Sequence, residues 1–182
     1  MHDALIGYTG FVGGNLVRQR EFDDFYNSRN IEAVRGRKFD TVICAGAPAE
    51  KWKANQNPES DLTNINYLIE NLAQMQARKL ILVSTVDVYA SPHGVDELTP
   101  IETTGLHAYG RHRRMLEEFA SANFDALIVR LPGLFGTGLK KNAIYDFMHD
   151  NDVAQLDSDG VFQFYCLDNL WSDIQVAITH GL

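Results

Sequence analysis

Short apolar runs alternate with longer stretches of helical periodicity along this chain. The runs lie at residues 4–7, 22–26, 41–45, 79–83 and 126–131, and each has the length of a buried strand. Between them, apolar residues recur at intervals of three and four, which is typical of a helix with one face on a core. This order predicts a parallel sheet, because parallel strands need long crossover connections.

The same periodicity predicts where the helices lie. They are expected at residues 14–21, 31–34, 57 to about 76, 108–122, 142–149 and 168–179, with residues 161–167 extended and residues 10–13 forming a turn. Pro58 suits a first helical turn, and Gly181 suits the end of the last helix. The predicted fold class is α/β: a Rossmann-like doubly wound parallel sheet with helices on both faces, in one domain over residues 1–182.

Composition and charge narrow the function classes. The chain of 182 residues has 16 basic and 24 acidic side chains, and its formal net charge of −8 disfavours nucleic-acid and membrane-surface partners. No apolar run approaches the ~20 residues of a membrane helix, and no leader sequence is recognised. Cys44 and Cys166 are far apart, which favours a reducing cytoplasm. The histidines lack metal-ligand spacing, so no metal is predicted.

Three glycines stand where the first predicted strand meets the first predicted helix. They are Gly7, Gly10 and Gly13, in the sequence Gly7-Tyr8-Thr9-Gly10-Phe11-Val12-Gly13. A turn without Cβ atoms lets main-chain N–H groups approach a pyrophosphate and lets the helix pack close to the sheet. A plain turn with packing glycines is the alternative, and the flanking strand and helix favour a dinucleotide site.

The end of the second predicted strand indicates which dinucleotide is bound. NAD sites usually place an acidic residue there, whereas this chain continues Tyr26-Asn27-Ser28-Arg29-Asn30. Ser28 and Arg29 offer a hydroxyl and a cation for a 2′-phosphate, which favours NADP slightly over NAD. In the alternative, Arg29 is a solvated loop residue, and Asp23 or Asp24 binds the ribose.

A hydroxyl, a phenol and a cation are candidate catalytic groups. Thr85 follows directly from the strand at residues 79–83, and Tyr109 and Arg113 are neighbours on one helix face. A phenol with an ordinary pKa of ~10 would need that pKa to fall by about three units to act near neutral pH. In the alternative, Arg113 pairs with Glu117, as Arg114 pairs with Glu118, on the surface of the helix.

Taken together and in order, these segments resemble the extended short-chain dehydrogenase/reductase superfamily, and within it the NAD(P)-dependent sugar-nucleotide epimerases and dehydratases. The resemblance covers nearly the whole chain. It rests on the glycine turn, Ala45-Gly46-Ala47, Asn64, the segment at residues 84–89, the pair Tyr109-x-x-x-Arg113, and residues 130–136.

The resemblance implies roles for individual residues. Tyr109 would be the general acid/base, Thr85 would orient the substrate or polarise its oxygen, and Arg113 stands where the family has a lysine. The residues implied in NAD(P) binding are Gly7, Thr9, Gly10, Phe11, Val12, Gly13, Asn27, Ser28, Arg29, Ala45, Gly46, Ala47, Asn64, Ser84, Tyr109, Arg113, Leu131 and Pro132. The implied reaction is hydride transfer on a small molecule, a nucleotide sugar or a related compound, in a homodimer formed by the helices with Asn64 and Tyr109.

Two departures from the family pattern leave an alternative open. A guanidinium is planar and forked, so Arg113 does not reproduce a compact ammonium at a ribose. Residues 137–182 lead towards a substrate lobe that the sequence mostly lacks, which makes the chain either a truncated form or a reduced domain with another task. The alternative function is a non-catalytic NAD(P)-binding domain with a regulatory or redox-sensing role. Lys51, Trp52 and Lys53 are expected in an ordinary exposed loop.

Overall fold

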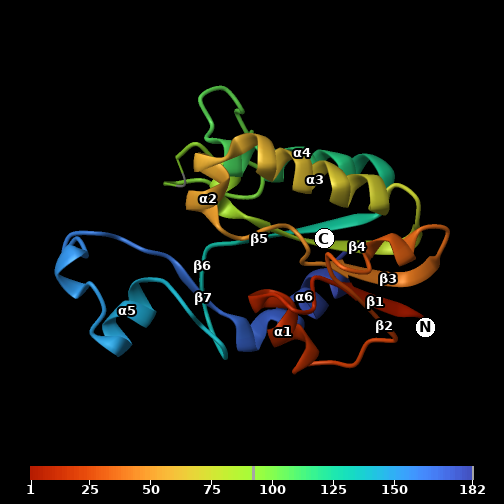
Figure 1. Cartoon of the computed structure of the whole chain (residues 1–182). Helices are drawn as coiled ribbons and strands as arrows, with labels where there is room; N and C mark the ends of the chain where they lie inside the picture. The colour runs from red at the N-terminus through yellow and green to blue at the C-terminus, as the bar shows by residue number, and fades with distance from the viewer. Residues whose placement is uncertain (92, 182) are drawn as a thin grey trace.

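A five-stranded parallel sheet forms the centre of the computed structural model, which describes residues 1–91 and 93–181 (Figure 1). The strands are β1 (Asp3–Ile6), β2 (Asp24–Tyr26), β3 (Lys38–Cys44), β4 (Gln76–Thr85) and β5 (Ala126–Leu131). Their spatial order is β2-β1-β3-β4-β5, so the winding direction changes between β1 and β3. The predicted Rossmann-like doubly wound sheet is confirmed, and ligands of such sheets bind beyond the carboxyl ends at this change of direction.

Helices cover both faces of the sheet. In Figure 1, α3 (Pro58–Leu72) and α4 (Ala108–Asn123) lie on one side, and α1 (Phe11–Val17) and α6 (Leu170–Thr179) lie on the other. Successive strand residues alternate between the two layers, because side chains of a strand point to opposite faces. Leu80 and Leu82 pack with residues of α3 and α4, whereas Ile81 packs with residues of α1 and α6. The unbroken apolar runs of the sequence therefore serve two cores.

Shorter elements complete the chain. They are the helix α2 (Lys51–Gln56), the 3-10 helices η1 (Ile31–Val34), η2 (Val86–Val88), η3 (Val153–Gln155) and η4 (Leu167–Asn169), the strands β6 (Gly133–Phe135) and β7 (Phe164–Cys166), and the helix α5 (Ala143–His149). β6 and β7 pair in a small parallel sheet of their own. The segment between them, with α5 and η3, extends away from the main body in Figure 1.

The first predicted helix was wrong in its position. It was expected at residues 14–21 after a turn at 10–13, but α1 begins at Phe11, inside that turn. Leu16 of this helix is fully buried, whereas Val17 is 41% exposed. The long helix expected to reach about residue 76 ends at Leu72, because Gln76 pairs with Lys38 as the first residue of β4.

The predicted exposed loop after the third strand is also corrected. Residues 51–56 form α2, and Ala54 is its one buried residue, so no apolar periodicity marks the helix in the sequence. The expected extended stretch at 161–167 contains only the short strand β7, and the last helix begins at Leu170 after η4.

Among the described residues, no helix is both long and apolar enough to cross a membrane. The same residues contain no group of three or more histidine, cysteine, aspartate and glutamate side chains arranged to hold a metal ion.

Candidate functional site

The turn between β1 and α1 brings main chains into close contact. Gly7 has a φ of +88°, and a Cβ atom there would collide with the carbonyl oxygen of Ala45 at the end of β3. A Cβ atom on Gly13 would collide with the carbonyl oxygen of Gly7. Gly10 is the extended residue before α1, and within the part of the chain that the structure describes no side chain caps the first N–H groups of that helix. The turn thus packs closely against the main chain at the end of β3, and the N–H groups at the start of α1 can donate to an anionic group, as the binding of a dinucleotide requires.

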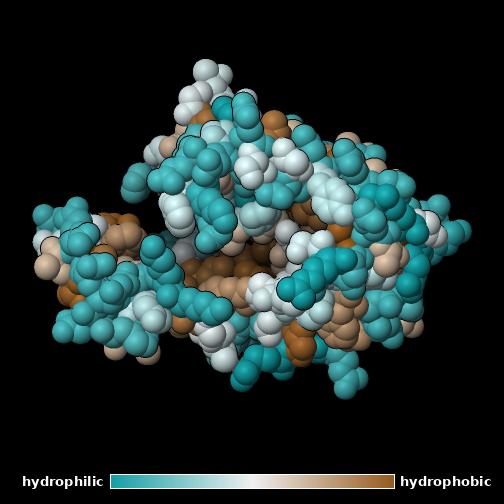
Figure 2. All heavy atoms as spheres, viewed as in Figure 1, coloured by the Kyte–Doolittle hydropathy of each residue, from teal (hydrophilic) through white to brown (hydrophobic). Residues whose placement is uncertain are grey.

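A cavity of about 760 Å³ lies beside this turn, and Figure 2 shows a hollow with an apolar floor in this face of the molecule. The volume lies within the range of small-molecule sites. Most of the residues singled out in the sequence line this one cavity: Gly7, Thr9, Gly10, Phe11, Val12, Asn27, Ser28, Ala45, Gly46, Ala47, Asn64, Ser84, Thr85, Tyr109, Arg113, Leu131 and Pro132. The fold therefore brings together segments that are far apart in the sequence.

Two of the singled-out residues do not line the cavity. Gly13 is buried beneath Gly7, where it serves the close crossing of the turn. Arg29 is exposed, and its main-chain N–H donates to the side chain of Asn27. Tyr67 does line the cavity, although the sequence did not single it out. Its helical spacing of three residues from Asn64 is a signal that could have found it.

Tyr109 lies near the start of α4, which is held by two side-chain caps. The main-chain N–H of Tyr109 donates to Asn55 Oδ1 at 3.0 Å, and that of Gly110 donates to His107 Nδ1 at 3.0 Å. The tyrosine is 8% exposed. Burial raises the pKa of its phenol above the ordinary value, and Arg113 and Thr85 act in the opposite direction. In the protein alone, the phenol is therefore neutral at physiological pH, and the fall in pKa considered from the sequence is not present.

Arg113 is buried and engaged by other protein groups. Its Nη1 donates to Asp61 Oδ2 at 2.5 Å, its Nη2 donates to the carbonyl oxygen of Pro48, and its guanidinium carbon lies 4.0 Å from the centre of the Tyr109 ring. The surface ion pair of Arg113 with Glu117 considered from the sequence is not formed, because the guanidinium is buried and pairs with Asp61 on α3. His112 also contacts Asp61 Oδ2, at 2.7 Å. The positive charge therefore stays beside the phenol, over its ring face.

An acidic side chain stands beside Thr85 in the cavity. The main-chain N–H of Asp87 donates to Thr85 Oγ1 at 3.1 Å, and Lys51 Nζ donates to Asp87 Oδ1 at 2.6 Å. The interpretation of Lys51 as an ordinary loop residue is wrong, because this ion pair joins α2 to η2 at the cavity wall. Among the described residues that line the cavity, Asp87 is the only acidic one, against Lys51, Arg113 and Lys141.

Gly110 controls how closely α4 approaches η2. A Cβ atom at this position would overlap the carbonyl oxygen of Asp87. The helix that carries Tyr109 therefore rests directly on the main chain of the segment that carries Thr85.

These features define a class: an α/β protein with a candidate dinucleotide cavity at the change of winding direction of its sheet. The chain belongs to the NAD dependent epimerase/dehydratase family, whose model matches residues 20–150. The glycine turn lies outside the matched residues.

Curated relatives are similar over part of their length. The chain is 28% identical over 116 residues to a bifunctional UDP-glucose 4-epimerase and UDP-xylose 4-epimerase of Pisum sativum. This match covers 60% of the chain and 33% of the relative, so the chain spans about a third of that protein.

Solved structures share the fold at low sequence identity. A dTDP-4-dehydrorhamnose reductase from Clostridium acetobutylicum is 17% identical with a TM-score of 0.75, and the match covers 99% of this chain and 71% of that one. A UDP-glucuronic acid 4-epimerase variant from Bacillus cereus, in complex with NAD and a fluorinated UDP-glucuronic acid, is 15% identical with a TM-score of 0.73. That match covers 98% of this chain and 73% of the epimerase.

Proposed function

We propose that this chain binds NAD(P) in the cavity and performs hydride transfer on a nucleotide sugar or a related compound. The observation that carries the proposal is that the glycine turn, Thr85 and Tyr109 line the same cavity. The nicotinamide would supply the hydride chemistry, while the protein orients the substrate and moves a proton. Relatives named as UDP-sugar epimerases support the substrate class.

The residues present fit such a cofactor. No described side chain caps the start of α1, so a pyrophosphate can accept hydrogen bonds from its main-chain N–H groups. Lys141 adds positive charge at the cavity wall, where Lys51 is paired with Asp87, and this charge suits both a dinucleotide and the diphosphate of a nucleotide sugar.

Tyr109 would exchange the hydroxyl proton of the substrate. A neutral phenol donates a proton, so this form serves the reduction of a carbonyl to an alcohol. Thr85, whose hydroxyl lies at the carboxyl end of β4, would orient the substrate oxygen. Arg113, held by Asp61, would keep a positive charge at the ring of Tyr109.

We further infer a slight preference for NADP over NAD. Ser28 lines the cavity after β2, Arg29 follows it, and neither Asp23 nor Asp24 is among the cavity residues. Titration with NADPH and NADH, repeated with Arg29→Ala, tests this inference. Equal affinities for the two cofactors, or a preference for NADH, would remove it.

The experiment that tests the proposal is calorimetric titration of the chain with NADPH and NADH, with Gly10→Val as the control. Gly10 lines the cavity, and among the described residues only the Gly7 carbonyl oxygen lies within 4 Å of where its Cβ atom would be, at 3.3 Å. Valine at this position should obstruct the turn, and circular dichroism checks that the variant still folds. Binding by the wild type that is lost in Gly10→Val supports the site. Equal binding by both proteins, or none by the wild type, contradicts it.

Turnover is tested with Tyr109→Phe in the presence of nucleotide sugars and cofactor. The proposal expects loss of hydride transfer with cofactor affinity retained. Cofactor binding without any turnover in the wild type would instead make the chain a non-catalytic NAD(P) binder.

We also propose that residues 1–182 act as one NAD(P)-binding unit, with residues 137–182 leading towards a substrate lobe, and that two copies associate through α3 and α4. Analytical ultracentrifugation tests the association. A monomer at micromolar concentration would exclude this dimer as the stable form.

A further inference from the structure

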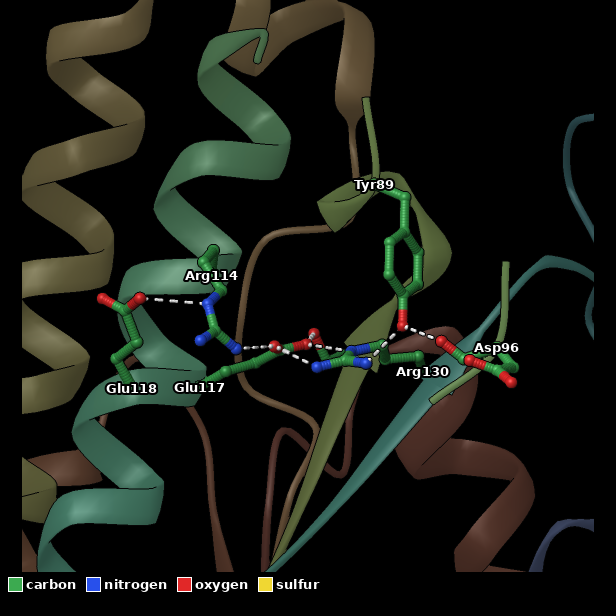
Figure 3. A network of polar contacts seen from close by, with 7 residues as sticks. Tyr89, Asp96, Arg114, Glu117, Glu118 and Arg130 are labelled. Carbon is green, nitrogen blue, oxygen red and sulfur yellow. Dashed lines mark hydrogen bonds and ion pairs between the residues drawn. The ribbon is translucent and has the colours of Figure 1, made fainter. Parts of the chain in front are cut away.

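Glu117 on α4 carries a fully buried carboxylate with a complete set of partners (Figure 3). Ser84 Oγ donates to Oε1 at 2.6 Å, and Arg130 donates from Nε to Oε1 at 3.0 Å and from Nη2 to Oε2 at 2.9 Å. Arg114 Nη1 adds a contact to Oε2 at 3.2 Å. A charge without exposure is retained in a fold only when it is paired in this way.

The partners of Glu117 flank the candidate catalytic threonine. Ser84 immediately precedes Thr85 on β4, and Ser84 pairs with Arg130 on the neighbouring strand β5. The remaining Nη1 of Arg130 donates to the Tyr89 hydroxyl at 2.6 Å, and this hydroxyl donates to the carbonyl oxygen of Asp96 at 2.7 Å. One network therefore holds the chain on both sides of Thr85, before it at Ser84 and after it at Tyr89.

Glu117 also belongs to α4, the helix that carries Tyr109, the candidate proton donor. Glu117 follows Tyr109 by eight residues on α4, about 12 Å along the helix axis. We propose that Glu117 is a positioning residue, which sets the place of Thr85 relative to Tyr109 through Ser84 and Arg130. This inference rests on the proposed function, because it assigns Thr85 and Tyr109 to one reaction.

A role in stability alone accounts less well for the network. Apolar side chains of similar volume would join α4 to the sheet at least as firmly as a buried ion pair. The hydroxyl partners of the network lie instead at the two ends of the segment that carries Thr85. Glu117 itself does not line the cavity, so it would act through its partners and not on the substrate.

The test compares Glu117→Gln and Tyr89→Phe with the control Glu118→Gln. Glu118 is on the same helix, 57% exposed, and pairs with Arg114 outside the buried part of the network. Tyr89→Phe keeps the ion pair and removes one hydroxyl, so it is the milder variant if Glu117→Gln unfolds. Amide hydrogen exchange of residues 84–89, cofactor affinity and kcat are measured for each protein.

We expect exchange of this segment to accelerate about tenfold in both network variants and not in Glu118→Gln. Turnover should fall about tenfold to a hundredfold through kcat, with cofactor affinity unchanged, as small misplacements of reacting groups do. In a Thr85→Val background, Glu117→Gln should cause little further loss, because the two residues act as one unit.

Three results would overturn the inference. They are unchanged exchange of residues 84–89 in folded Glu117→Gln, unchanged kcat in that variant, and losses that multiply fully in the double variant. Absence of turnover in the wild type would refute the proposed function. The exchange measurement would still decide whether Glu117 holds the segment around Thr85.

Discussion

Removal of the Asp61 carboxylate would strand a buried cation between α3 and α4. The Asp61 side chain is 4% exposed and that of Arg113 is 3% exposed, with 2.5 Å between Oδ2 and Nη1. In Asp61→Ala the guanidinium would keep the carbonyl oxygen of Pro48, while its buried Nε has no hydrogen-bond partner among the described residues. His112 Nδ1 would lose its contact as well.

The expected cost follows from this burial. Loss of one partner of a buried ion pair costs about 3–5 kcal/mol, because the other charge is left uncompensated. Urea unfolding monitored by circular dichroism measures it. With an m-value of about 1–3 kcal/mol/M, the midpoint should fall by at least about 1 M. The control Glu118→Ala removes an exposed partner of Arg114 and should cost less than about 1 kcal/mol.

A second variant separates the stranded charge from lost packing. Arg113→Met in the Asp61→Ala background removes the cation and keeps an apolar side chain, so it should recover part of the lost stability. A free energy of unfolding for Asp61→Ala within about 1 kcal/mol of the wild type, at an unchanged m-value, would refute the reasoning.

Further predictions concern the turn, the thiol and the phenol. Gly13→Ala should lower the melting temperature, because its Cβ atom would collide with the main chain of Gly7. Gly14→Ala should raise it, because the nearest atom to its Cβ is 3.8 Å away and alanine is more favourable than glycine in a helix by about 1 kcal/mol. Thermal scans in which both variants shift the melting temperature in the same direction would contradict this. Burial raises the pKa of the Cys44 thiol from 9.0 to about 11, so the folded state holds this proton longer than the unfolded state. The free energy of unfolding should therefore fall by up to about 3 kcal/mol between pH 9 and 11, and Cys44→Ala should flatten that slope. Burial raises the pKa of Tyr109, so its phenol should ionise only above pH 10. The ionisation is measured as the difference in near-ultraviolet absorbance between the wild type and Tyr109→Phe.

The fold was predictable where apolar residues dominate the local pattern. Residues 126–131 form β5 as predicted, and the helix with Tyr109 ends within one residue of its expected end, because burial of apolar side chains decides both. Element ends were less predictable. Lys38 and Gln76 begin their strands through main-chain pairing with each other, and polar side chains carry no signal of that pairing.

The polar partners of the candidate site were beyond the reach of local spacing. Spacing of four residues pointed Arg113 towards Glu117, whereas the structure pairs Arg113 with Asp61, 52 residues earlier, and Glu117 with Arg130 on β5. These contacts exist only after α4 has packed on α3 and on the sheet. Thr85 and Tyr109, which line the cavity, belong to segments that the sequence resemblance singles out, whereas Lys51 lies on a helix with a single buried residue.

Because a Cβ atom at position 110 would overlap the Asp87 carbonyl oxygen, glycine there sets how closely the helix of Tyr109 approaches the segment of Thr85, the two residues of the proposed reaction. Substitution of Tyr109 or Thr85 changes the chemical groups and leaves their separation unchanged. Alanine at position 110 would do the reverse, because its Cβ atom would push the two segments apart while both hydroxyls remain. Such a variant would show how strongly the proposed proton transfer depends on the distance between these two segments.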